Sequence, residues 1–212
     1  MKETINKIET SATETEYLSI GSLFWEMIKV FLLAVVIIIP VRVFLFQPFF
    51  VQGSSMEPNF EDGQYLVISE FGYKQTDINL LKNFRFTVHS FRIIGRQDVT
   101  VFRYPKNPKQ FFIKRVIGLP KETVEIRGGK VIIYNAEQPN GYVLDESAYL
   151  STESFAPDYI MPKVVLGNDE YFLLGDNRMF SYDSRSIGPV KKKQIIGRVL
   201  LRAWPVERLS VY

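Results

Sequence analysis

A long apolar segment near the N-terminus constrains this chain more than any other feature. Residues 27–46 carry only two charges, on Lys29 and Arg42, and residues 30–39 are all apolar. Since a helix rises about 1.5 Å per residue, a segment of this length can cross a hydrocarbon core of about 30 Å. The segment therefore predicts a transmembrane helix. Pro40 and Arg42 indicate a kink, or the level of the lipid headgroups, near its end.

Two other interpretations of this segment are a buried core helix and a cleaved leader peptide. The strictly apolar residues alone would be too few to span a bilayer, which favours a core helix. A leader fits poorly, because the residues before the segment are many and acid-rich and no small-x-small cleavage pattern follows. We therefore expect a polar, disordered tail over residues 1–22, an uncleaved anchor over residues 23–46 and a globular domain over residues 47–212. A cluster of aromatic side chains is expected at or near the membrane interface: Phe44, Phe46, Phe49 and Phe50.

After the anchor, short strand-like runs bounded by glycines and prolines dominate the sequence. The predicted strands are Tyr65–Ser69, Val99–Tyr104, Phe111–Ile117, Thr123–Ile126, Lys130–Tyr134, Glu170–Leu174 and Arg198–Ala203. Gly128 and Gly129 predict a hairpin, because a tight turn needs positive φ. The expected fold class is mainly β, a β-rich domain after one N-terminal transmembrane helix. Residues 74–97 and 135–168 carry few strand signals and are interpreted as insertions.

The residue types that are missing narrow the chemistry. The chain has no cysteine and one histidine, which excludes disulfides, thiolate zinc sites and cysteine nucleophiles and argues against any zinc site. A formal net charge of +3 is too small to indicate nucleic-acid binding. The basic run at residues 191–193 is expected to lie on a solvated loop. A serine activated by a lysine is then the hydrolytic pair that the residues support best.

Ser55 lies in a loop that suits a nucleophile. Gly53 allows a tight backbone path before it, and Pro58 restricts the residue that precedes the proline. Such a turn could hold a hydroxyl outward with backbone N–H groups beside it, as a nucleophile with an oxyanion hole requires. The alternative is an ordinary turn serine, since the segment lacks the closing glycine of a nucleophile elbow.

Lys114 lies in an apolar run, FFIKRVIG at residues 111–118. The two-residue period of a strand places it on one face with Phe112 and Val116, and Arg115 on the other face. If the lysine face is buried, desolvation lowers the lysine pKa and favours the neutral amine that a general base must be. If that face is wet, Lys114 points to water and is ordinary. Arg115 cannot be the base, because its pKa is too high.

A polar turn follows the strand at residues 170–174. Its glycine and polar residues are turn formers, so a plain surface loop is one interpretation. Residues of alternating charge favour a braced, rigid loop instead: Asp176, Arg178, Asp183 and Arg185. Ser181, in the same loop, offers a hydroxyl that could orient a neutral amine.

Taken in order, these segments resemble the type I signal peptidases, the membrane-bound serine proteases that remove signal peptides from exported proteins. The anchor is followed by FLFQPFFVQGSSMEPNF, GQYLVISEFGY at residues 63–73, QDVTVFRYP at 97–105, FFIKRVIGLP at 111–120 and YFLLGDNRMFSYDSRSIGPV at 171–190. The match covers most of residues 44–73, 97–135 and 169–205. Several ordered motifs that agree are more specific than any one of them.

The resemblance implies roles for these residues. Ser55 corresponds to the family nucleophile, Lys114 to its general base and Ser181 to the serine that hydrogen-bonds the lysine. Asp183 and Arg185 match a structural ion pair near the site. Other matched residues support the site: Gly53, Met56, Pro58, Gly175, Asp176, Asn177 and Arg178. The family fold is a β-rich catalytic domain resting against the membrane, and its activity uses no cofactor and no metal.

The chain departs from the family pattern in a few places. Gly53 stands where some members have a serine whose hydroxyl completes the oxyanion hole, so only the Ser55 N–H carries over as a donor. Three further differences lie beside the motifs: Asn59-Phe60 for a commoner Thr-Leu, Gln97 for a usual glycine, and Lys121-Glu122 for a usual Gly-Asp. These differences concern turn details rather than the Ser/Lys pair.

The resemblance implies a single-pass protein of the plasma or inner membrane, with the catalytic domain on the extracytoplasmic side. The expected partners are signal-peptide-bearing preproteins, the lipid bilayer and the protein-export machinery, and not nucleic acid. Charge alone determines the orientation weakly, because Lys7 and Lys29 precede the apolar core and Arg42 follows it. Substrates are expected to bind extended along a strand edge, with small side chains before the cut.

Three alternatives use a different chemistry or substrate. A Ser-His-Asp hydrolase would have to use His89. Organellar inner-membrane peptidases and self-cleaving repressors share Ser/Lys chemistry, but the repressors lack such an anchor and would carry a DNA-binding segment, for which residues 1–22 are too short. A membrane-anchored β domain that binds peptides without cutting them would be indifferent to the loss of the Ser55 hydroxyl.

Overall fold

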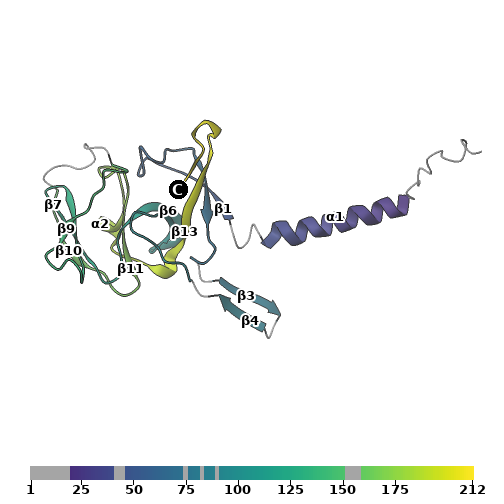
Figure 1. The fold of residues 1–212 in the computed structure, drawn as a ribbon, viewed down its shortest axis with the longest axis horizontal. Coiled ribbons are helices and arrows are strands. Elements are labelled where there is room, and N and C mark those ends of the chain that lie inside the picture. Colours follow the sequence, from purple (N-terminus) through teal and green to yellow (C-terminus); the bar gives the residue numbers. More distant parts are fainter. Residues whose placement is uncertain (1–19, 41–45, 74–75, 82–83, 89–90, 151–158) are drawn as a thin grey trace, which may run out of the picture. The chain divides into compact units, whose positions relative to one another are not determined.

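The computed structural model describes residues 20–40, 46–73, 76–81, 84–88, 91–150 and 159–212 (Figure 1). The chain forms two compact units, Met1–Val41 and Arg42–Tyr212. Most of the predicted polar tail and the alternative base His89 lie outside the described residues.

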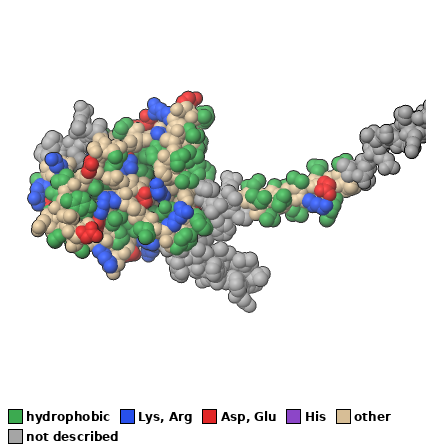
Figure 2. All heavy atoms as spheres, in the orientation of Figure 1, with side chains coloured by type: hydrophobic (Ala, Val, Ile, Leu, Met, Phe, Trp, Pro, Cys, Tyr) green, Lys and Arg blue, Asp and Glu red, His purple; other side chains and the backbone are tan. Residues whose placement is uncertain are grey.

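The first unit contains one described helix, α1 (Ile20–Pro40). It is long and apolar enough over residues 21–38 to cross a membrane, and most of its large apolar side chains are exposed (Figure 2). An exposed ion pair joins Lys29 Nζ to Glu26 at 2.7 Å. The helix begins at Ile20 and ends at Pro40, and residues 41–45 of the predicted anchor, residues 23–46, lie outside the described residues.

The second unit is β-rich, which confirms the predicted fold class. Among the described residues its largest sheet has eight strands, in the order β1-β2-β13-β5-β6-β11-β12 with β14 beside β13, and neighbouring strands are antiparallel. These strands are β1 (Phe46–Phe50), β2 (Tyr65–Ser69), β5 (Val99–Tyr104), β6 (Asn107–Gly118), β11 (Glu170–Leu174), β12 (Val190–Lys191), β13 (Ile195–Trp204) and β14 (Ser210–Val211). Short helical turns flank β12 and β14: α2 (Ser184–Ile187), η3 (Lys192–Gln194) and η4 (Val206–Arg208).

Two smaller sheets complete the described fold. One has the order β10-β7-β8-β9, and the other pairs β3 with β4. Their strands are β3 (Thr76–Leu81), β4 (Phe84–Val88), β7 (Thr123–Arg127), β8 (Lys130–Tyr134), β9 (Tyr142–Val143) and β10 (Met161–Val165). The segments 74–97 and 135–168, in which few strand signals were recognised, therefore each contain two strands.

The predicted hairpin at Gly128 and Gly129 is confirmed. The two glycines have φ of 57° and 70°, and Arg127 of β7 pairs with Lys130 of β8. Both turn residues thus adopt the left-handed conformation that glycine tolerates best.

Strand β1 was not predicted from the sequence, because its residues continue the apolar run that begins in the anchor. It pairs with β2 along its whole length, and the Phe49 ring packs edge-on against Phe111 of β6 with centroids 5.4 Å apart. A buried cluster lies beneath the chain that joins β1 to β2: Val51, Met56, Phe60, Leu66, Ile68, Val99, Val101 and Val199. This cluster anchors the loop that carries Ser55.

Candidate active site

Ser55 lies in the loop between β1 and β2, and two side chains fix this loop to the core. Met56 is 1% exposed and Phe60 is completely buried, and the Phe60 N–H donates to the Met56 carbonyl oxygen at 2.9 Å. Before the serine, Gly53 has a φ of 86° and its N–H donates to Asp62 Oδ1 at 2.6 Å. The loop is therefore braced on both sides of Ser55, which itself remains partly exposed.

Lys114 reaches the same site from β6, and its side chain is buried. The residue is 4% exposed, and Nζ lies 2.6 Å from Ser55 Oγ and 2.8 Å from the Ile113 carbonyl oxygen. The Phe112 ring lies on the same side, with its centroid 5.8 Å from Nζ. The interpretation in which Lys114 points to water is therefore wrong.

The surroundings of Lys114 change its protonation. Burial lowers the pKa of Lys114 to about 8, the nearby carboxylates of Asp183 and Asp176 oppose this change, and Arg185 adds to it. At pH 7 roughly one amine in ten is then neutral, against about one in 2,500 for a lysine with the reference pKa of about 10.4. The site thus supplies a population of neutral lysine next to a serine hydroxyl.

The loop after β11 contacts the backbone of the serine loop directly. The Asn177 N–H donates to the Ser55 carbonyl oxygen and Asn177 Nδ2 donates to the Ser54 carbonyl oxygen, both at 3.1 Å. Gly175 lies closer still. A methyl group on its α-carbon would collide with the Ser55 carbonyl oxygen and with the Ser181 side chain. These contacts make the residues after β11 part of the frame that holds Ser55.

Ion pairs brace this loop, as its alternating charges predicted. Arg115, on the face of β6 opposite Lys114, donates two hydrogen bonds to Asp176 at 2.8 and 2.6 Å. Arg185 donates to Asp183 at 2.8 and 2.9 Å, and Asp183 Oδ2 also accepts the Gly175 N–H at 3.0 Å. Both acceptor carboxylates are buried. Each is matched by a cation with two directed hydrogen bonds, which is the geometry that makes a buried charge tolerable.

Ser181 is not hydrogen-bonded to Lys114 in this structure. Its Oγ is buried and has no hydrogen-bond partner within the described part of the chain, and the second acceptor of Lys114 is the Ile113 carbonyl oxygen instead. A buried hydroxyl without a partner is uncommon, because its desolvation is uncompensated. Pro58 is exposed and follows a cis peptide bond.

Replacing Gly175 with alanine tests the role of this close approach. We expect Gly175→Ala to lower the rate of any reaction that uses the Ser55 hydroxyl by about 10²-fold, because the methyl group displaces the Ser55 backbone, and to lower the free energy of unfolding by about 1–3 kcal/mol. Kinetic assays and thermal unfolding measure the two effects. Gly95→Ala is a matched control, because a Cβ there meets nothing closer than 3.4 Å. Equal activity of the two variants would contradict the role of Gly175 in holding the Ser55 backbone.

A cleft of about 320 Å³ opens beside the Ser55 and Lys114 side chains. Its walls come from β1, β2, β5, β6 and the loops that follow β1 and β11. It is lined by Phe49, Phe50, Val51, Gln52, Gly53, Ser54, Ser55, Leu66, Val101, Phe111, Phe112, Ile113, Lys114, Phe180 and Tyr182. The cleft is thus mostly apolar, with the serine hydroxyl and the lysine amine at its polar end.

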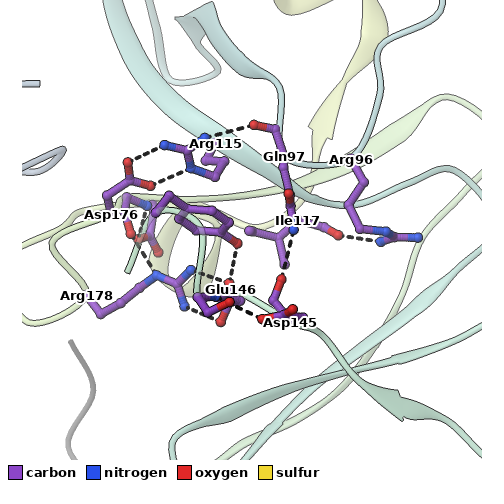
Figure 3. A network of polar contacts seen from close by, with 12 residues as sticks. Arg96, Gln97, Arg115, Ile117, Asp145, Glu146, Asp176 and Arg178 are labelled. Carbon is purple, nitrogen blue, oxygen red and sulfur yellow. Dashed lines mark hydrogen bonds and ion pairs between the residues drawn. The ribbon is translucent and has the colours of Figure 1, made fainter. Parts of the chain in front are cut away.

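Several contributors to the site were not recognised in the sequence. Phe49 and Phe50, which are expected at or near the membrane interface, also line the cleft. Glu146 belongs to a segment interpreted as an insertion and joins the ion-pair network of the loop after β11 (Figure 3). Tyr149, in the same segment, donates its hydroxyl to Glu146. No local signal marks Glu146, because its partner Arg178 lies 32 positions away. Among the described residues, no group of three or more His, Cys, Asp or Glu side chains could hold a metal ion.

Comparison with known proteins gives consistent matches over most of the chain. A family described as "Signal peptidase, peptidase S26" matches residues 24–204. Signal peptidase I of Leptolyngbya laminosa is 35% identical over 192 residues, which cover 87% of this chain and 82% of that protein. Signal peptidase I V of Bacillus subtilis (strain 168) is 32% identical over 179 residues, 82% of this chain and 94% of that protein. A solved signal peptidase I structure from Enterococcus faecalis V583 is 33% identical and covers 51% of this chain and 98% of that one, with a TM-score of 0.40.

Proposed function

This chain belongs to the signal peptidase family, peptidase S26, and on that premise we propose that it removes signal peptides from preproteins with Ser55 as nucleophile and Lys114 as general base. The observation that carries the proposal is the 2.6 Å contact between Lys114 Nζ and Ser55 Oγ in a site where the lysine is buried. A nucleophile and its base must lie within hydrogen-bond reach, and the base must be able to lose its proton near neutral pH.

In the proposed mechanism, neutral Lys114 accepts the Ser55 hydroxyl proton as Oγ attacks the carbonyl carbon of the last signal-peptide residue. The tetrahedral intermediate collapses when the lysine ammonium gives this proton to the leaving amine, which breaks the peptide bond. A water molecule then attacks the acyl-enzyme ester, with Lys114 again taking the proton, and Ser55 regains it as the signal peptide leaves. In each step the Lys114 amine accepts or gives the transferred proton.

The oxyanion of the intermediate needs hydrogen-bond donors that are not already used. The Ser55 N–H makes no hydrogen bond to an acceptor in the part of the chain that the structure describes, and we assign it as one donor. Ser181 Oγ, buried and without a partner there, is assigned as an acceptor that orients the lysine amine during the reaction. Ser181 and the Ser55 backbone both lie against the α-carbon of Gly175.

The substrate is proposed to bind as an extended strand in the apolar cleft. Strand β1 pairs with β2 alone among the described strands, and β6 pairs with β11 only from Arg115 onward, so both present unpaired backbone near the cleft. An added strand would gain main-chain hydrogen bonds there, and the apolar lining would accept small side chains before the cut. Helix α1 is proposed to anchor the enzyme in the bilayer, with the catalytic domain on the extracytoplasmic side. Substrates tethered to the same membrane then have a high effective concentration at the site.

The pH dependence of kcat/KM tests the identity of the base. Since Lys114 must be neutral to accept a proton, activity should rise with pH and level off above an acid limb near pH 8, the pKa of the buried lysine. A histidine base such as His89 would place that limb near about 6.5, and an unperturbed lysine near about 10.4. Either of those results, measured with a labelled preprotein and the full chain in detergent, would refute the proposed base.

A further inference from the structure

We propose that Glu146, with Tyr149 and Gln97, forms a positioning unit that sets the geometry of the Ser55 and Lys114 pair through the loop at residues 175–178. The inference rests on the proposed function, because it assigns a role to residues around that same site. None of these three residues lines the cleft, so each would act through other groups and not on the substrate.

The loop at residues 175–178 holds the backbone of the nucleophile loop in place. Both hydrogen bonds of Asn177 to the serine loop come from it, and Gly175 touches the Ser55 carbonyl oxygen. Arg178 Nε donates to the Gly175 carbonyl oxygen at 2.8 Å and so closes the loop on itself. Whatever fixes the Arg178 guanidinium therefore also fixes the backbone that holds Ser55.

Glu146 is the residue that fixes it (Figure 3). Arg178 Nη2 and Nη1 donate to the two Glu146 carboxylate oxygens at 2.5 and 3.2 Å. The Arg178 side chain is fully buried and that of Glu146 is 10% exposed. Because burying a guanidinium is costly without a compensating charge, loss of the Glu146 charge would weaken the restraint on the buried Arg178 side chain.

Tyr149 connects the segment at residues 145–149, which contains Glu146, to the strand that carries Lys114. Its hydroxyl donates to Glu146 Oε1 at 2.7 Å, and its ring lies under Arg115, with the guanidinium carbon 4.1 Å from the ring centroid. Arg115 is the neighbour of Lys114 in β6. In addition, Asn59 Nδ2 donates both to the Tyr149 carbonyl oxygen at 2.6 Å and to Asp176 Oδ2 at 2.9 Å. The segment thus contacts the nucleophile loop, the base strand and the loop after β11.

Gln97 connects the segment at residues 145–149 to Arg115 of β6. Its Nε2 donates to the Asp145 carbonyl oxygen at 2.9 Å, while its own carbonyl oxygen accepts from Arg115 Nη1 at 2.9 Å. Gln97 has a φ of 69°, a left-handed conformation that costs a residue with a Cβ more than it costs glycine. A glycine could make the same backbone contacts more easily, but it would lack the amide that holds Asp145.

The test compares two charge-removing variants of the full chain. Glu125 is the matched control: it also pairs with an arginine, accepts a tyrosine hydroxyl and is 11% exposed, but it lies in the β7–β8 hairpin. Glu146→Gln is expected to lower kcat for a labelled preprotein by about 10- to 30-fold with KM within about twofold, because positioning and not the cleft is altered. Glu125→Gln should keep the wild-type kcat.

Amide hydrogen exchange provides a readout that does not depend on activity. Exchange of the Asn177 N–H, which donates to the Ser55 carbonyl oxygen, should become about tenfold faster in Glu146→Gln and remain unchanged in Glu125→Gln. The Leu166 N–H, bonded to the Glu122 carbonyl oxygen at 2.8 Å, reports on global loosening and should not change. Wild-type kcat and wild-type Asn177 exchange in Glu146→Gln would overturn the proposal. A lower thermal stability of this variant, with both kcat and Asn177 exchange unchanged, would overturn it as well.

Two milder variants keep the test decisive if Glu146→Gln does not fold. Tyr149→Phe and Gln97→Ala each remove one hydrogen bond of the unit, and each should lower kcat about three- to tenfold without changing KM. Wild-type kcat in both would overturn the proposal. If the wild-type protein cleaves no preprotein, the proposed function fails, and Asn177 exchange in these variants still decides whether the unit positions Ser55.

Discussion

Lys114→Ala is expected to lower preprotein cleavage by about 10⁴-fold or more while the fold is retained. The lysine is the proposed acceptor of the Ser55 proton. Among the described residues, Lys114 is the one hydrogen-bond partner of Ser55 Oγ. Arg115, the next residue of β6, cannot take over, because its guanidinium holds its proton and is already paired with Asp176. Cleavage of a labelled preprotein measures the loss, and thermal unfolding checks the fold.

Two controls separate lost chemistry from lost packing. Lys114→Met keeps most of the buried aliphatic volume and should be as inactive as the alanine variant, with less loss of stability. Lys130→Ala, at an exposed position of β8, should cleave at the wild-type rate. Activity within tenfold of wild type in either Lys114 variant would exclude this lysine as the base.

The strands around the site could be predicted because they are short apolar runs with clear breaks. The predicted runs at residues 99–104 and 111–117 correspond to β5 and β6, which pair as neighbours. The alternation in FFIKRVIG correctly separated Lys114 from Arg115. It could not show which face is buried, since period-two patterns assign residues to faces without saying what covers each face. That decision needed residues distant in the sequence, because Lys114 Nζ donates to Ser55 Oγ in the loop after β1.

Long-range pairing is what the sequence could not predict. The charges after β11 indicated a braced loop, but any acid or base in the chain was a candidate partner. Glu146 was missed for this reason, as was the role of Gln97, whose left-handed backbone is not expected for a glutamine. Strand β1 was missed for a different reason: its apolar residues cannot be separated from those of the preceding helix by hydropathy alone.

The predicted hydrogen bond between Lys114 and Ser181 is absent from the structure. The motif order predicts that both side chains belong to one site, and the structure brings Ser181 beside Gly175 and Ser55. Which acceptor the lysine selects depends on torsion angles within a buried pocket. Here Nζ donates to the Ile113 carbonyl oxygen, so the orienting role of Ser181 remains part of the proposal.

The central claim, that Ser55 attacks the scissile carbonyl, is tested most directly by one substitution. Ser55→Ala removes a single oxygen atom whose described hydrogen bond is with Lys114, so the braced loop should keep its structure. A control at Ser186, an exposed serine of α2, should leave the rate unchanged.

The measurement is the release of signal peptide from a labelled preprotein by equal amounts of wild-type and Ser55→Ala protein, with the products identified by mass spectrometry. We predict a rate at least about 10⁴-fold lower for Ser55→Ala, because the acyl-enzyme cannot form. Cleavage of the same bond at the wild-type rate by Ser55→Ala would contradict the account.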